Sequence, residues 1–205
     1  MKELLLILLV IPVISYSQIK LDTLNKTVSY SNIYEINKSK NQLHQKAMEW
    51  IAINFKDANE VVKLNTDDKI IAKGNFSIDI TSGDYSFTYP IKFIMEISFK
   101  ENKYKLDMHT FDLSQNGFTS PIKNYYFSND FNDYIEILKE QLTQYTDKTT
   151  TKSFQKLFNN PEELNKMYQD YKTVALQIRN KVDAEVKLNA ISLFEYISKK
   201  SEDSW

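Results

Sequence analysis

The chain has 205 residues, and its 26 Lys and Arg nearly balance its 27 Asp and Glu, giving a formal net charge of −1. This balance argues against a nucleic-acid-binding protein that relies on a basic face. The sequence has no Cys, which excludes disulfides and thiolate metal sites. It has two His and three Gly, too few for most metal sites or glycine-rich phosphate-binding loops. We therefore expect no cofactor. With 42% hydrophobic residues, the chain can bury a core of its own.

The N-terminus has the pattern of a signal peptide. Residues 4–14 form an unbroken apolar run, which is short for a transmembrane helix of about 20 residues. Ser15 and Ser17 place small residues at positions −3 and −1 of a cleavage site before Gln18. The alternative is a buried N-terminal helix. We expect residues 1–17 to be removed and the mature chain, without a transmembrane span, to be exported to the periplasm or secreted.

The mature chain begins with a polar segment, a strand and a helix. Residues 18–27 are polar and predict a linker, and apolar alternation over residues 28–36 predicts a first strand. Ser39 and Gln42 have the spacing of a capping box, in which two backbone donors are satisfied reciprocally. We therefore expect a helix over about residues 40–57, with its apolar stripe buried.

Strict alternation of apolar residues is the clearest pattern in the sequence. It covers residues 70–80, 87–99 and 104–108, and two-residue hairpin loops at 83–84 and 101–102 separate these segments. Because a slip of one residue would turn a whole apolar set to the wrong face, the loops also fix the register. We expect a three-stranded antiparallel meander with one apolar face packed by helices.

The same register places rows of polar side chains on the sheet face opposite the core. Glu96 and Asp107 face each other directly in one row, together with Ile71. The next two rows hold Lys73, Ile94 and His109, and then Asn75, Lys92 and Phe111. We expect these rows to form one polar face.

The candidate site consists of four residues of this face: Lys73, Glu96, Asp107 and His109. Facing carboxylates disfavour joint ionisation, so one of them should titrate high unless Lys73, Lys92 or Lys105 compensates. The functional hypothesis is an acid–base or cation-binding pair in a polar groove with His109. The alternative is a solvated face whose lysines neutralise two ordinary acids.

Residues 131–205 are expected to be a C-terminal helical region. An apolar stripe predicts a helix over about residues 132–145, and Asn160-Pro161 followed by two acids predicts the start of a helix over about 161–199. That helix would be roughly 58 Å long, whereas a compact chain of this length has a radius of gyration of about 16 Å. We expect part of it to cover the sheet and the rest to contact a partner or a second copy.

Several of these features together resemble a known family. The helix segment Lys-Ala-Met-Glu-Trp-Ile at 46–51, its end at 55–58 and the strand entry Lys-Ile-Ile-Ala-Lys-Gly at 69–74 resemble the Bacteroidetes domain of unknown function 4468, which has a TBP-like fold. The resemblance covers about residues 28–113, within a domain that we place at 28–130. It implies an α+β fold and a cell-envelope setting, and it supplies no catalytic residues.

Two classes of function fit the sequence. The first is an exported, non-catalytic module that binds a protein, peptide or envelope component through the open sheet face or the long helix. The second is a hydrolase-like enzyme that uses carboxylates of the polar sheet face. We favour the first, because the sequence shows no activated nucleophile, metal-ligand set or cofactor loop. A flat polar face would support the binding module, and an enclosed cavity with convergent acids would support the enzyme.

Overall fold

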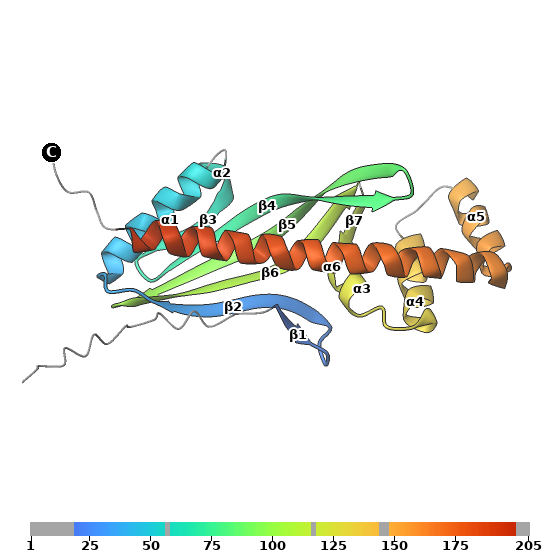
Figure 1. Cartoon of the computed structure of the whole chain (residues 1–205), viewed down its shortest axis with the longest axis horizontal. Helices are drawn as coiled ribbons and strands as arrows, with labels where there is room; N and C mark the ends of the chain where they lie inside the picture. The colour runs from blue at the N-terminus through green and yellow to red at the C-terminus, as the bar shows by residue number, and fades with distance from the viewer. Residues whose placement is uncertain (1–18, 56–57, 116–117, 144–147, 200–205) are drawn as a thin grey trace, which may run out of the picture.

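The chain folds as an antiparallel sheet with helices packed against one face (Figure 1). The computed structural model describes residues 19–55, 58–115, 118–143 and 148–199, so the signal peptide expected at 1–17 lies outside the described residues. The elements of the described chain are β1 (Lys20–Asp22), β2 (Thr27–Glu35), α1 (Lys40–Asn54), α2 (Ala58–Val61), β3 (Val62–Thr66), β4 (Lys69–Ser82), β5 (Tyr85–Lys100), β6 (Lys103–Gln115), β7 (Phe118–Pro121), α3 (Lys123–Tyr126), α4 (Phe131–Leu142), α5 (Lys148–Phe158) and α6 (Pro161–Ser198).

The sheet has the strand order β1-β2-β6-β5-β4-β3, with β7 pairing β6 beyond this path. The expected meander of β4, β5 and β6 is confirmed, together with both hairpin loops. Ile80 lies opposite Phe87 as the register requires, and Gly83 takes the positive φ of 57° that its tight turn needs. The predicted α+β architecture, an antiparallel sheet with one face packed by helices and a long C-terminal helix, is confirmed.

One row of the predicted register is wrong because β6 contains a bulge. Thr110 has a φ of 53°, and the pairing of β5 with β6 shifts between Lys92 and Ile94. Lys92 therefore pairs with Asp112, and not with Phe111. The extra residue turns Phe111 to the core face, where it is buried with its ring centroid 5.8 Å from that of Phe93.

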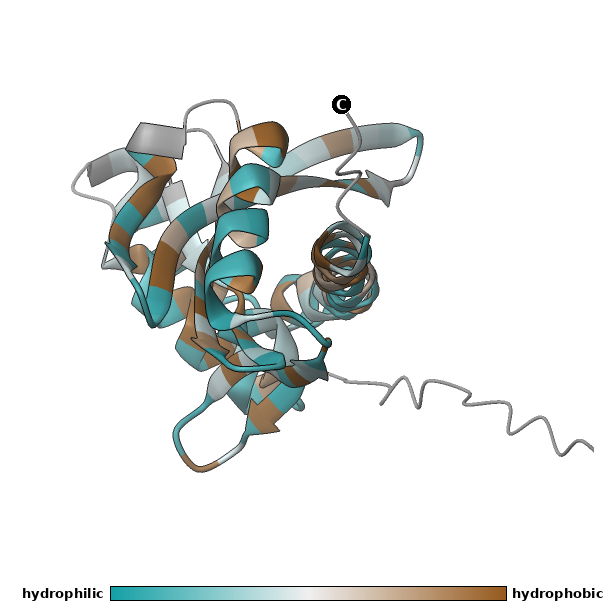
Figure 2. Ribbon diagram, turned by 90° about the vertical axis from the view of Figure 1, so that its left-hand side faces the viewer, coloured by the Kyte–Doolittle hydropathy of each residue, from teal (hydrophilic) through white to brown (hydrophobic). Residues whose placement is uncertain are grey.

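Helices α1 and α6 cover the apolar face of the sheet. The capping box of α1 is present as predicted at Ser39 and Gln42, and the helix buries Trp50, whose indole Nε1 donates a hydrogen bond of 3.0 Å to Ser192 Oγ of α6. Figure 2 shows α6 end-on beside the sheet. The odd-numbered residues 91–99 of β5 are buried on this side, whereas the even-numbered residues between them are exposed or half-buried. The second face of the sheet is therefore open.

The long helix α6 is unbroken over 38 residues and belongs to two hydrophobic clusters. Its C-terminal part, from Ile178 to Ile197, packs into the sheet core. Its N-terminal part extends beyond the sheet, as part of this helix was expected to do, and is covered by α4 and α5, where Leu164 and Tyr168 join a second cluster with Tyr134. Leu176, Leu188 and Ile191 remain exposed on its outer side.

Three other local expectations need correction. The segment 18–27, predicted to be a linker, contains β1, because its residues Lys20–Asp22 pair with β2 at the sheet edge. The sequence predicts a short edge strand over residues 121–127, but β7 spans Phe118–Pro121 and α3 follows it at Lys123–Tyr126. The sequence did not predict α5, because the Thr residues at its start have low helix propensity and favour a connector. Packing of Phe154 and Leu157 against the second cluster stabilises it instead.

Candidate functional site

The row that contains Glu96 and Asp107 crosses the open face of the sheet. Glu96 of β5 lies directly opposite Asp107 of β6, as predicted, and Ile71 of β4 lies opposite Glu96. Ser31 of β2 extends the row beyond Asp107. Because side chains alternate along each strand, these four residues from four neighbouring strands lie in one row on the same face of the sheet.

The second predicted row is also in place. His109 lies opposite Ile94, and Ile94 lies opposite Lys73. His109 Nε2 is 3.2 Å from Glu96 Oε1, so the two rows are linked by a hydrogen bond. Lys73 is exposed and is not among the ion-pair partners of the two acids within the described chain.

Each of the two facing carboxylates has a lysine partner. Glu96 Oε2 is 2.7 Å from Lys69 Nζ, and Asp107 Oδ1 is 2.9 Å from Lys105 Nζ. Lys105 is one of the three lysines that we expected could compensate the pair, whereas the partner of Glu96 is Lys69, which was not among them. The hydrogen bond from Lys69, with a further one to His109, lowers the pKa of Glu96 below its ordinary value. For Glu96 this supports the alternative of a neutralised, solvated face.

Replacing Glu96 with Gln should remove a contribution to stability that depends on pH. A carboxyl with a lowered folded-state pKa stabilises the fold above its ordinary pKa of 4.5, and this contribution is lost as pH falls through the folded-state value. We expect Glu96→Gln to lower the free energy of unfolding by up to about 1 kcal/mol at pH 7. The difference from the unsubstituted chain should disappear near pH 3 in urea titrations. Glu195→Gln, at an exposed position of α6, is the matched control and should show no such pH dependence.

Apolar side chains border the charged rows of the open face. Ile33 of β2 is 58% exposed and Leu64 of β3 is 40% exposed. Ile71 and Ile94 are half-buried between the charged positions. The face thus combines paired charges with small apolar areas, which is the composition of many protein-binding surfaces.

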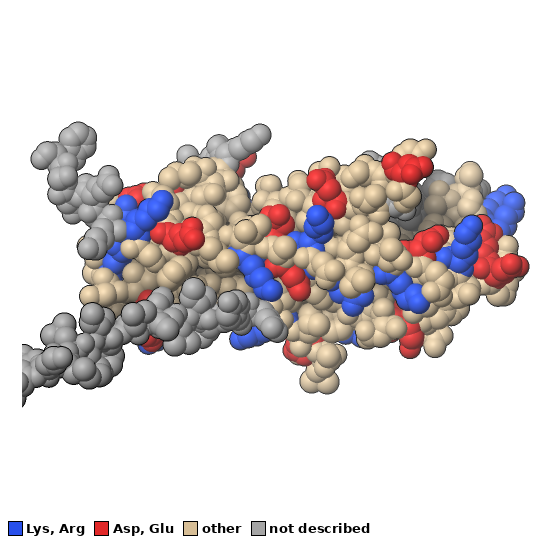
Figure 3. All heavy atoms as spheres, viewed as in Figure 1, with Lys and Arg blue, Asp and Glu red and all other residues tan. Residues whose placement is uncertain are grey.

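The surface on the α6 side carries charges of both signs. In Figure 3, Lys and Arg alternate with Asp and Glu along this side, without an extended area of one sign. Among the described residues, no helix has both the length and the apolar character needed to cross a membrane. In the same part of the chain, no three His, Asp or Glu side chains are grouped as metal ligands would be.

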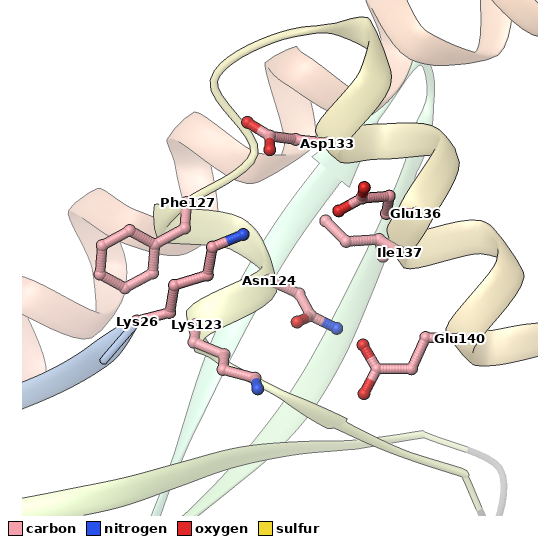
Figure 4. Close-up of a pocket in the computed structure, with 8 residues that line it drawn as sticks. All are labelled: Lys26, Lys123, Asn124, Phe127, Asp133, Glu136, Ile137 and Glu140. Carbon is pink, nitrogen blue, oxygen red and sulfur yellow. The ribbon is translucent and has the colours of Figure 1, made fainter. Parts of the chain in front are cut away.

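A pocket lies between α3, α4 and the connection from β1 to β2, away from the rows of Glu96 and Asp107 (Figure 4). It has a volume of about 160 Å³ and contains Glu136, Glu140 and Asn124. Sequence reasoning missed it. The only sequence signal was the spacing of Glu136 and Glu140 by one helical turn, which a solvated helix face shows equally well.

Comparison with known proteins identifies the sheet domain. Residues 30–114 match a family model described as "Domain of unknown function (DUF4468) with TBP-like fold". The chain resembles the DUF4468 family over residues 30–114, so the resemblance predicted over about 28–113, with its TBP-like fold, is confirmed. None of the curated proteins matches the chain.

Two solved structures have a similar fold over most of the chain. A DUF4468 family protein from Bacteroides ovatus aligns with a TM-score of 0.56 and 10% identity, over 90% of this chain and 94% of its own. A TBP-like protein from Parabacteroides distasonis aligns with a TM-score of 0.55 and 15% identity, over 86% and 96%. These fractions exceed residues 30–114, so the shared fold extends beyond the residues that match the DUF4468 model.

Proposed function

We propose that the protein is an exported, non-catalytic module of the periplasm or cell envelope that binds a protein, peptide or envelope component. The single observation that carries this proposal is the open face of the sheet. Alternate residues of β5 are buried under helices on one side and left accessible on the other. A sheet that needs only one face for its core leaves the second free for a ligand.

The chemistry of the open face supports binding better than catalysis. Lys69 and Lys105 form ion pairs with Glu96 and Asp107, and the hydrogen bond from Lys69 lowers the pKa of Glu96, which favours a permanently charged carboxylate over a general acid at that position. Neither the pocket at α4 nor the hollow beside Glu35 and Glu101 is lined by Glu96 or Asp107. A mainly polar sheet face with small apolar areas suits the binding of a peptide or a protein. The balanced net charge gives no support to a nucleic-acid ligand.

Substitutions on the open face should abolish ligand binding without unfolding the protein. The mature chain, residues 18–205, would be immobilised and exposed to an envelope fraction of the native cells. We expect a variant with Ile33→Asp, Glu96→Gln and Asp107→Asn to retain less than a tenth of the bound component. The matched control with Leu188→Asp and Glu195→Gln, on the outer side of α6, should retain it fully. If the α6 control variant loses the bound component and the open-face variant retains it, the binding surface is α6. A second copy of the chain would then become the alternative partner.

The export proposal has a separate test. The apolar run at 4–14 and the small residues Ser15 and Ser17 predict cleavage before Gln18. Mass spectrometry of the protein isolated from its native cells should find Gln18, or its cyclised form, at the N-terminus. A native protein that retains Met1 in the cytoplasmic fraction would contradict export.

A further inference from the structure

The pocket beside α4 separates positive from negative charges. Lys26, from the connection between β1 and β2, and Lys123 of α3 lie on one side, and Glu136 and Glu140 of α4 lie on the other (Figure 4). Among the described residues, no ion pair within 4.0 Å joins these lysines to these acids. The pocket therefore keeps opposite charges apart across a space of about 160 Å³.

Asn124 provides a buried polar group between the two sides. The residue is only 7% exposed, and Tyr171 Oη of α6 donates a hydrogen bond of 2.8 Å to its backbone carbonyl, which fixes its position. Its side-chain amide has no hydrogen-bond partner within the described chain. Figure 4 shows this amide directed into the pocket, between the lysines and the acids. The two atoms of this amide are not among the fully buried side-chain atoms that lack a partner in the described chain, so the amide meets the space of the pocket, where a ligand that accepts and donates hydrogen bonds would bind it.

The size and walls of the pocket restrict the ligand. A cavity of about 150 Å³ accommodates benzene, so a pocket of this size takes a molecule of roughly six to eight heavy atoms. Phe127 and Ile137 supply apolar wall. Asp133 also lines the pocket, which gives three acids against two lysines and disfavours a ligand of net negative charge.

We propose that this pocket binds a small zwitterion without net charge, a free amino acid with a short aliphatic side chain. Its ammonium group lies against Glu136 and Glu140, its carboxylate lies between Lys26 and Lys123, and Asn124 hydrogen-bonds between them. A short aliphatic side chain contacts Phe127 and Ile137. This site is separate from the open sheet face, so it can fail or succeed independently of the proposed binding function.

Nuclear magnetic resonance titration of the chain with L-alanine tests the proposal. We expect saturable shifts of the Asn124 side-chain NH₂ signals. Acetate and ethylamine, which each carry one half of the zwitterion, should bind at least tenfold more weakly. Glutamate should bind more weakly than alanine because of the excess of acids. Shifts that do not saturate, or equal binding of acetate or ethylamine, would overturn the proposal.

Matched variants locate the binding. Glu136→Gln combined with Glu140→Gln, and separately Lys123→Gln, should each weaken alanine binding at least tenfold. Lys139→Gln, on the exposed side of α4, and Glu195→Gln, at the far end of α6, remove the same charges elsewhere and should bind alanine as the unsubstituted chain does. All the substituted positions are exposed, so circular dichroism should show an unchanged fold. Alanine binding that is unaltered by the pocket variants would contradict the assignment.

Discussion

Leu193→Ala should lower the free energy of unfolding by about 2–5 kcal/mol. Leu193 lies in the part of α6 that packs on the sheet, and its side chain is fully buried in the main core. Its neighbour Ser192 accepts the indole hydrogen bond of Trp50, so α1 and α6 are locked together at this point. A loss of this size is a large fraction of the 5–15 kcal/mol that stabilises an ordinary domain. Guanidinium unfolding followed by fluorescence would measure it.

The control is Ile191→Ala, two residues away on the same helix. Ile191 is 51% exposed, and its truncation should change the free energy of unfolding by less than about 0.5 kcal/mol. Equal losses for the two variants would mean that this end of α6 does not pack on the sheet. The sequence already indicates this distinction, because the apolar stripe with 3–4 spacing contains Leu193, between Ala190 and Ile197, and leaves out Ile191.

Gly74→Ala should destabilise the sheet by about 1–3 kcal/mol, although alanine normally favours folding by limiting the unfolded chain. A Cβ at Gly74 would lie 2.3 Å from Cζ of Phe93, the residue opposite it in the register. The Phe93 ring is buried and packed between Phe76 and Phe111, so it has no free space to enter. The midpoint of urea unfolding should fall accordingly.

A second substitution separates steric conflict from a backbone effect at Gly74. Phe93→Leu shortens the side chain that blocks the Cβ, so Gly74→Ala should cost much less in a Phe93→Leu background than in the unsubstituted chain. This coupling would appear in a double-mutant cycle. Additive effects of the two substitutions would place the cost in the backbone and contradict the close approach.

The meander was predictable because alternation and turn chemistry gave the same answer. Two-residue loops at 83–84 and 101–102 leave one pairing for each apolar set, and the structure has it. The bulge at Thr110 also left a signal, since the apolar positions change parity between Met108 and Phe111. The predicted register continues past this change of parity without a shift, so its third row is wrong. Helix α5 was harder to predict from the sequence, because its stability comes from contacts with α4 and α6 and not from its own helix propensity.

The candidate site was only partly predictable from the sequence. Register alone placed Glu96 opposite Asp107 and His109 in the next row. It could not choose between Lys69 and Lys73 for Glu96, because both lie diagonal to it on β4, opposite Ser98 and Ile94. Sheet twist and side-chain conformation decide that choice. The pocket at α4 depends on segments more than 100 residues apart, which no local pattern connects.

Site-specific photocrosslinking in the native cells tests the open face as the ligand-binding surface most directly. One photoreactive residue would replace Ser98 on the open face of β5, and a second would replace the exposed Lys187 on α6. We predict a discrete crosslinked product with an envelope component from position 98 and none from position 187. A product from position 187 alone, or from neither position, would contradict the open sheet face as the binding surface.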